Sequence, residues 1–144
     1  MISETMKSSQ IVAGNNTACA ACTVGILALQ GGYESHQHIL KTLGCTTILV
    51  RTVEDFQKID RLILPGGEST TIIKLLKRHH LWDTLFKFAQ DHPVFATCAG
   101  TILMGSSSEP EAEDQLKLVD IHVIRNYYGT QINSRIVALS VTLP

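Results

Sequence analysis

The stretch LILPGGESTT, residues 62–71, decides the fold that the sequence predicts. Three apolar residues are followed by a proline and two glycines, which is typical of a buried strand that ends in a tight turn. Ser69 or Thr70 can then cap a helix that begins at this point. A strand, a glycine turn and a helix in direct succession form the repeating unit of α/β proteins.

The same unit occurs on both sides of this stretch. Residues 24–29, VGILAL, form a continuous apolar run that Gln30-Gly31-Gly32 ends, and a helix is expected over residues 34–43, with His36, Ile39, Leu40 and Leu43 on one face. Residues 93–97 predict a short strand, and residues 99–104 a short helix. Further strands are expected over residues 46–50, 118–124 and 136–143, and further helices over residues 53–58 and near 81–88. Uninterrupted apolar runs indicate strands buried on both faces, so we predict a doubly wound, mostly parallel sheet.

Composition limits the domain organisation and the function classes. The chain is 44% apolar and 17% charged with a net charge of −1, which is typical of a globular protein that binds neither nucleic acid nor an anionic membrane. No apolar run approaches the ~20 residues that cross a bilayer, and no secretory signal pattern is present, so a cytoplasmic location is expected. Residues 1–22 are rich in small polar residues and predict a flexible leader, which leaves residues 23–144 as one domain.

The four cysteines are expected to be thiols, because disulfides are rare in the cytoplasm. Cys19 and Cys22 are spaced C-x-x-C, which permits redox chemistry or half of a zinc site. They precede the first strand and lack a second ligand pair, so incidental cysteines are the favoured interpretation and no metal is predicted. Cys45 is expected to be a small core residue.

Residues 96–100, ATCAG, can present a nucleophile. A nucleophile on a sharp strand-to-helix turn needs small neighbours, and Ala96 and Gly100 meet that need around Cys98. The N–H groups of Ala99 and, on the glycine turn of residues 65–69, of Gly67 could bind an oxyanion. Taken alone, the pentapeptide fits a buried cysteine at a strand end equally well. The glycine turn has no G-K-[ST] ending, so a phosphate-binding loop is not favoured. Because ligands of doubly wound sheets bind beyond the carboxyl ends of the strands, we expect these loops and Gln30-Gly31-Gly32 to converge.

These motifs together resemble a known family. GILALQG (25–31), LILPGGESTT (62–71) and TCAG (97–100) are similar to the class I glutamine amidotransferases, which have a flavodoxin-like fold. Arg125-Asn126 and Gly129-Thr130-Gln131 narrow the resemblance to the glutaminase subunits of pyridoxal 5′-phosphate synthase, the PdxT/SNO family. The resemblance covers residues 24 to about 142.

The resemblance implies an activity and the residues that carry it. Members hydrolyse L-glutamine to glutamate and ammonia, need no cofactor, and pass the ammonia to the synthase (lyase) subunit that builds the vitamin B6 cofactor. Cys98 matches the nucleophile that forms a thioester, and Arg125 matches a substrate contact. Gly67, Glu68 and Ser69 match the glutamine-binding loop. Gln30 and Gly31 match a loop that rearranges at the synthase interface to complete the oxyanion hole.

The sequence departs from the family in its catalytic base. The family carries a His-x-Glu pair near its C-terminus, but none of the six histidines here has Glu two residues later. The chain also ends at Pro144, before the last family segments, so we expect an incomplete fold and little glutaminase turnover. His92 should lie at the far end of the sheet from Cys98, and His122 on a strand.

Two other functions stay open at the level of sequence. The chain could be a non-catalytic module that still binds a synthase partner, or a thiol hydrolase or redox protein of related fold. The P-G-G-E-S loop and Arg125 favour glutamine over the latter.

Overall fold

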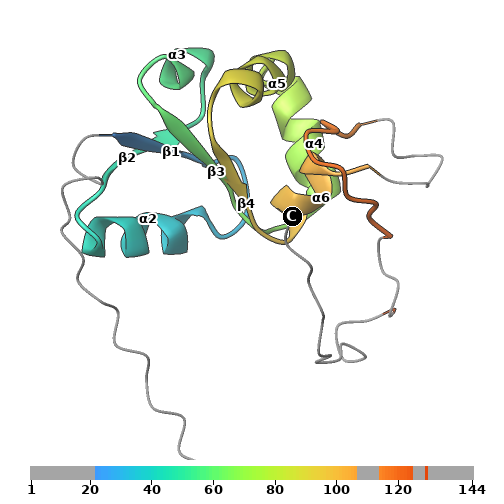
Figure 1. Cartoon of the computed structure of the whole chain (residues 1–144), viewed down its shortest axis with the longest axis horizontal. Helices are drawn as coiled ribbons and strands as arrows, with labels where there is room; N and C mark the ends of the chain where they lie inside the picture. Colours follow the sequence, from blue (N-terminus) through green and yellow to red (C-terminus); the bar gives the residue numbers. More distant parts are fainter. Residues whose placement is uncertain (1–21, 107–113, 125–128, 130–144) are drawn as a thin grey trace, which may run out of the picture.

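The structure, a computed structural model, describes residues 22–106, 114–124 and 129. Four parallel strands form one sheet in the order β2-β1-β3-β4, with helices on both faces (Figure 1). The strands and helices alternate along the chain: β1 (Thr23–Leu27), α2 (Tyr33–Thr42), β2 (Thr46–Val50), α3 (Val53–Phe56), β3 (Arg61–Leu64), α4 (Ser69–Arg78), α5 (Trp82–Asp91), β4 (Val94–Ala96) and α6 (Ala99–Met104). The predicted doubly wound parallel sheet is therefore confirmed.

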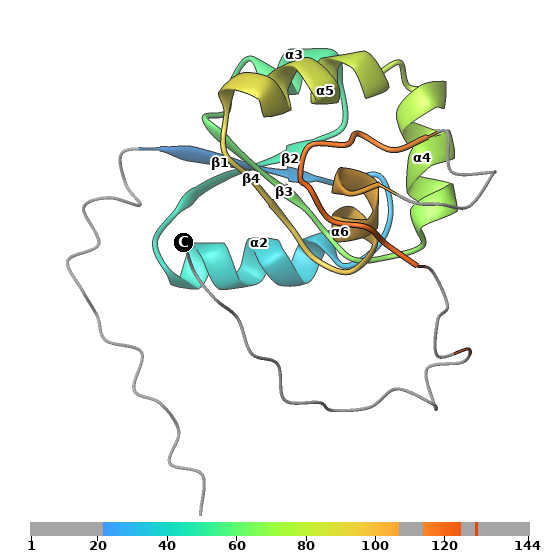
Figure 2. The same cartoon turned by 45° about the vertical axis from the view of Figure 1, so that its right-hand side comes forward.

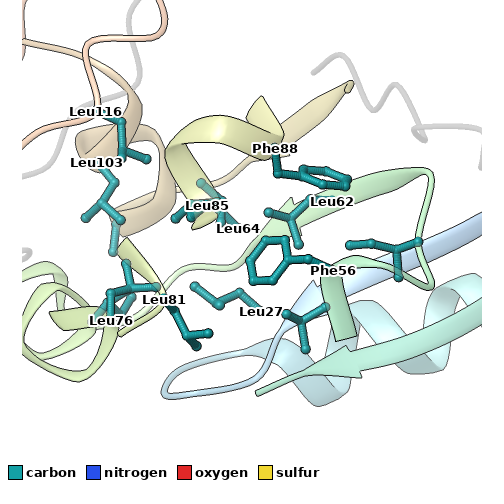
Figure 3. Packing of buried hydrophobic residues seen from close by; sticks show 14 residues of the cluster. Leu27, Phe56, Leu62, Leu64, Leu76, Leu81, Leu85, Phe88, Leu103 and Leu116 are labelled. Carbon is teal, nitrogen blue, oxygen red and sulfur yellow. The ribbon is translucent and has the colours of Figure 1, made fainter. Parts of the chain in front are cut away.

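The larger core lies on the sheet face that α3, α4, α5 and α6 cover. Residues alternate between the two faces of a strand, so Leu62 and Leu64 of β3 point to the same side and are each 1% exposed. Phe56 of α3 and Phe88 of α5 pack edge to face above them, with ring centroids 5.5 Å apart (Figure 3). The remaining buried members of this cluster are Leu27, Val50, Ile59, Ile72, Leu76, Leu81, Leu85, Ala99, Leu103 and Leu116.

Helix α2 covers the opposite face of the sheet (Figure 2). Its residues Tyr33 and Leu40 pack against a smaller cluster of Val24, Ile26 and Ile63. The prediction for this helix was wrong in part, because Ile39 is 58% exposed and Leu43 is 39% exposed. The stripe that faces the sheet instead runs through residues 33, 36, 37 and 40, which are the half-buried positions of α2. Residue 39 lies on the flank of this stripe, and Leu43 caps the helix beyond its last turn.

The predicted strand over residues 118–124 was also wrong. The described part of this segment makes a single bridge, between His122 and Ser106, and otherwise follows the end of α6. Leu116 donates its N–H to the carbonyl of Leu103 at 2.8 Å, and Leu118 donates to that of Met104 at 2.8 Å. These contacts bury Leu116 against α6, whereas Val119, Ile121 and Ile124 of the predicted strand are 38%, 38% and 55% exposed. The predicted strand over residues 136–143 and most of the predicted leader lie outside the described residues.

The prediction that all four cysteines are thiols was wrong for Cys45. It is buried at 8% exposure, as a core residue should be, but it is disulfide-bonded. Cys98 is a free thiol, as expected.

Within the described residues, the helices are all too short or too polar to cross a membrane.

Candidate functional site

Three loops meet where β1, β3 and β4 end. The N–H of Gly32 donates to the carbonyl of Gly66 at 2.9 Å, and the N–H of Glu68 donates to Oε1 of Gln30 at 2.9 Å. These two bonds join the loop after β1 to the loop after β3. The loop after β3 also adjoins the turn after β4, because a Cβ placed on Gly66 would lie 3.2 Å from Cβ of Cys98. The predicted convergence of the three loops is confirmed.

Cys98 lies on a strained turn between β4 and α6. Its φ of 48° and ψ of −111° are rare for a residue with a side chain, and such outliers concentrate at functional sites. The side chain is exposed, and the residue is the N-cap of α6. Gly100 permits the turn, since a Cβ there would lie 2.3 Å from the carbonyl oxygen of Leu64. The sharp strand-to-helix turn that the sequence predicted at residues 96–100 is therefore formed.

Glycines let the neighbouring backbone come close. Gly31 has a φ of 94°, and a Cβ there would lie 2.0 Å from the carbonyl oxygen of Gly66. A Cβ on Gly67 would lie 2.5 Å from Oε1 of Gln30. A larger residue at either position would push the loop after β1 away from the loop after β3. Gly31 and Gly67 therefore allow the two loops to approach this closely. Gly66 brings the same loop beside the thiol, because a Cβ there would lie 3.9 Å from Sγ of Cys98.

The side chain of Glu68 caps α4. Its carboxylate accepts hydrogen bonds from the backbone N–H groups of Thr70 and Thr71, and from both threonine hydroxyls. These donors, the hydroxyls of Thr70 and Thr71 foremost, lower the pKa of Glu68 from 4.5 to about 2. The predicted caps, Ser69 and Thr70, were wrong: Ser69 is buried at 4% exposure and Thr70 donates to the cap. The carboxylate is thus engaged by the helix, and the loop offers a ligand chiefly its backbone.

Of the other predicted site residues, the structure describes Ala99 but not Arg125. Ala99 is the first residue of α6 and is buried directly behind Cys98, so its N–H belongs to the free first turn of that helix. Arg125 lies outside the described residues. No group of three or more His, Cys, Asp or Glu residues is placed to hold a metal ion in the part of the chain that the structure describes.

One histidine makes a contact near Cys98 that the sequence did not indicate. His92 stacks on Phe88 at the start of β4, at the far end of the sheet from Cys98, as predicted. His36 of α2 instead lies 3.3 Å from the hydroxyl of Thr97, measured from Nε2 to Oγ1. The sequence signal available was only its place on the sheet-facing stripe of the helix.

A family model matches most of the chain. Residues 26–142 match the model described as the SNO glutamine amidotransferase family. The chain belongs to the SNO glutamine amidotransferase family. The matched range contains Cys98 and all of the loops that meet around it.

Similar proteins agree with this family. A protein of Francisella tularensis subsp. tularensis named "Pyridoxal 5'-phosphate synthase subunit PdxT" is 45% identical over 117 residues, which cover 81% of this chain and 63% of that protein. A protein of the same name from Francisella tularensis subsp. novicida is also 45% identical over the same extent. This SNO family chain therefore spans less than two thirds of the length of these relatives.

Solved structures agree on the fold. A structure titled "Crystal structure of glutamine amidotransferase" is 38% identical with a TM-score of 0.68, and the match covers 76% of this chain and 59% of that one. A putative peptidase E from Listeria monocytogenes has a TM-score of 0.57 at 20% identity, over 71% of this chain and 65% of that one, and shows a shared fold only.

Proposed function

We propose that residues 23–144 belong to a glutaminase subunit that hydrolyses L-glutamine to glutamate and ammonia. The observation that carries the proposal is the position of Cys98, exposed on its strained turn beside the glycine loop of residues 65–69. Sequence similarity to proteins named as pyridoxal 5'-phosphate synthase subunits supports it. On the same basis, we propose the synthase (lyase) subunit of pyridoxal 5'-phosphate synthase as the partner that receives the ammonia.

The proposed reaction begins with attack of the Cys98 sulfur on the side-chain amide carbon of glutamine. A C–S bond forms, and the carbonyl electron pair moves to oxygen, where the N–H groups of Ala99 and Gly67 stabilise the oxyanion. The C–N bond then breaks as the nitrogen takes up a proton and leaves as ammonia. Water attacks the resulting thioester, the C–S bond breaks, and glutamate and the free thiolate are released. No cofactor takes part in these steps.

Substrate recognition is assigned to the loop of residues 67–69 and to Arg125. Because the Glu68 carboxylate caps α4, the loop is proposed to hold glutamine through its backbone N–H groups. Arg125 is proposed to bind the α-carboxylate, to which a guanidinium is suited in charge and geometry. Gln30 and Gly31, which contact this loop, are proposed to face the synthase partner and to complete the oxyanion hole when it binds.

The ammonia that leaves in this reaction needs a proton donor. No histidine of this sequence stands in a His-x-Glu pair. Loss of one member of a catalytic triad typically lowers turnover by several orders of magnitude. We therefore propose that these 144 residues bind glutamine more effectively than they hydrolyse it.

A glutamate-release assay with the synthase partner present tests the proposal. The 144-residue chain should be near background, and the same chain extended by a C-terminal segment bearing His-x-Glu should be active. Replacing that histidine by alanine, or Cys98→Ala in the extended chain, should abolish the activity. An extended chain that releases no more glutamate than its Cys98→Ala variant would refute the glutaminase assignment. Strong Cys98-dependent turnover by the 144-residue chain would contradict the proposed lack of a proton donor and would direct attention to His122.

A further inference from the structure

The turn that carries Cys98 must be held by its neighbours. A residue with a side chain at a φ of 48° relaxes to an ordinary conformation unless the surrounding contacts prevent it. Cys98 itself provides one such contact, because its carbonyl accepts from the N–H of Ile102 in α6 at 3.1 Å. The residue on its other side, Thr97, must be fixed as well.

Thr97 is fixed on three sides by three different elements. Its N–H donates to the carbonyl of Leu64, at the end of β3, at 3.1 Å. Its carbonyl accepts from the N–H of Gly100, in α6, at 2.9 Å. Its hydroxyl contacts Nε2 of His36, in α2, at 3.3 Å. Any residue except proline at position 97 can make the two backbone bonds, whereas the third needs a hydroxyl there and a hydrogen-bonding group at position 36.

His36 is well placed to act as a fixed support. It lies on the sheet-facing stripe of α2 and is half-buried, so its ring has few alternative positions. The helix itself is held against the sheet by Tyr33 and Leu40, one turn to either side of His36. The contact with Thr97 spans 61 residues of sequence and reaches the turn from the α2 face of the sheet, opposite α6.

We propose that His36 is a positioning residue for Cys98, which acts through the hydroxyl of Thr97 to hold the nucleophile turn in its strained conformation. This inference rests on the proposed role of Cys98. In this arrangement His36 does not exchange protons with the substrate. It sets the direction from which the sulfur approaches the amide carbon, and a misplacement of about 1 Å at this step can cost on the order of 100-fold in rate.

Covalent labelling of Cys98 tests the proposal without requiring turnover. The probe is a diazoketone analogue of L-glutamine, with site-resolved mass spectrometry giving the maximal rate (kinact) and the half-saturating concentration (KI). Thr97→Val and His36→Leu should each lower kinact by about tenfold. The value of KI should stay within about twofold, because the loop of residues 67–69 is untouched and sets how the analogue binds.

Conservative variants and a matched control separate positioning from general damage. Thr97→Ser and His36→Gln keep a hydrogen-bonding group and should restore most of kinact. His38→Leu changes an exposed histidine of the same helix and should leave kinact unchanged. The double variant Thr97→Val, His36→Leu should be no slower than either single variant, because both remove the same contact.

Several results would overturn the proposal. If Thr97→Ser lowers kinact as much as Thr97→Val does, the hydroxyl is irrelevant. If the double variant lowers kinact by the product of the two single effects, the two residues act separately. If His36→Leu fails to fold, the Thr97 pair decides alone. Iodoacetamide needs no glutamine site, so it serves as a second probe of Cys98. Its labelling rate should fall in the same variants as kinact does. Failure of the glutamine analogue together with a retained iodoacetamide series would refute the glutaminase assignment and leave the role of His36 supported.

Discussion

The backbone N–H of Glu68 donates a hydrogen bond to Oε1 of Gln30 at 2.9 Å, across 38 residues of sequence. The acceptor is the side-chain amide of a glutamine, the same chemical group that the proposed substrate carries. The loop of residues 67–69 therefore already binds a carboxamide oxygen through its backbone. The side chain of Glu68 meanwhile points to α4, where it caps the helix.

Gly31 sets the distance between the first two loops. Gly31→Ala should displace the Gly66 carbonyl, because a Cβ there would lie 2.0 Å from that oxygen and the φ of 94° disfavours alanine. Gly32→Ala is the matched control, since its Cβ would lie 4.0 Å from the same atom and its φ is −82°. A displacement of about 1 Å between reacting groups can lower a rate on the order of 100-fold. We therefore expect the rate at which the glutamine analogue labels Cys98 to fall at least about tenfold in Gly31→Ala and to change little in Gly32→Ala. Equal labelling of both variants would show that this loop does not shape the site.

Glu68 should contribute to stability in a pH-dependent way. Its pKa is about 2 in the folded chain against 4.5 as the ordinary value, so the folded state favours the ionised carboxylate. The contribution should be complete above pH 4.5 and be lost as the pH falls towards 2. Glu68→Gln should lower the free energy of unfolding by about 1 kcal/mol at neutral pH, through the weakened cap, and the difference from the parent should shrink in acid. Urea unfolding at several pH values measures this, and a difference that grows as the pH falls would contradict it.

Replacing a large side chain by alanine should lower the free energy of unfolding more on one face of the sheet than on the other. Leu64 is 1% exposed within the larger core, so Leu64→Ala should lower the free energy of unfolding by about 2–5 kcal/mol. Phe95, on β4, is 60% exposed on the α2 face, so Phe95→Ala should cost less than about 1 kcal/mol. Urea denaturation of the two variants measures both values. A cost for Phe95→Ala as large as that for Leu64→Ala would show that this face is covered in solution.

Most of the fold could be predicted because its signals are local. Continuous apolar runs ended by glycine or proline located β1 and β3, and the β-branched residues 46–50 located β2. Parallel pairing then required the loops after the strands to meet at one edge. Cys98 could be proposed as a nucleophile because a nucleophile turn demands small residues at fixed positions around it.

The remaining features depend on three-dimensional context. Any of Glu68, Ser69 and Thr70 could cap α4, and burial of Ser69 decided in favour of Glu68. The alternation in residues 118–124 does not reveal that their partner is the end of α6 and not a sheet. The contact of His36 with Thr97 joins two elements that no sequence spacing relates.

Competition labelling tests most directly whether Cys98 is a nucleophile that acts on glutamine. The chain is treated briefly with the diazoketone analogue, with and without excess L-glutamine, and the modified cysteines are located by mass spectrometry. We predict that Cys98, which is exposed, is labelled well before the less exposed Cys22 and that L-glutamine protects it. Preferential labelling of Cys22, or labelling of Cys98 that L-glutamine does not slow, would contradict the claim.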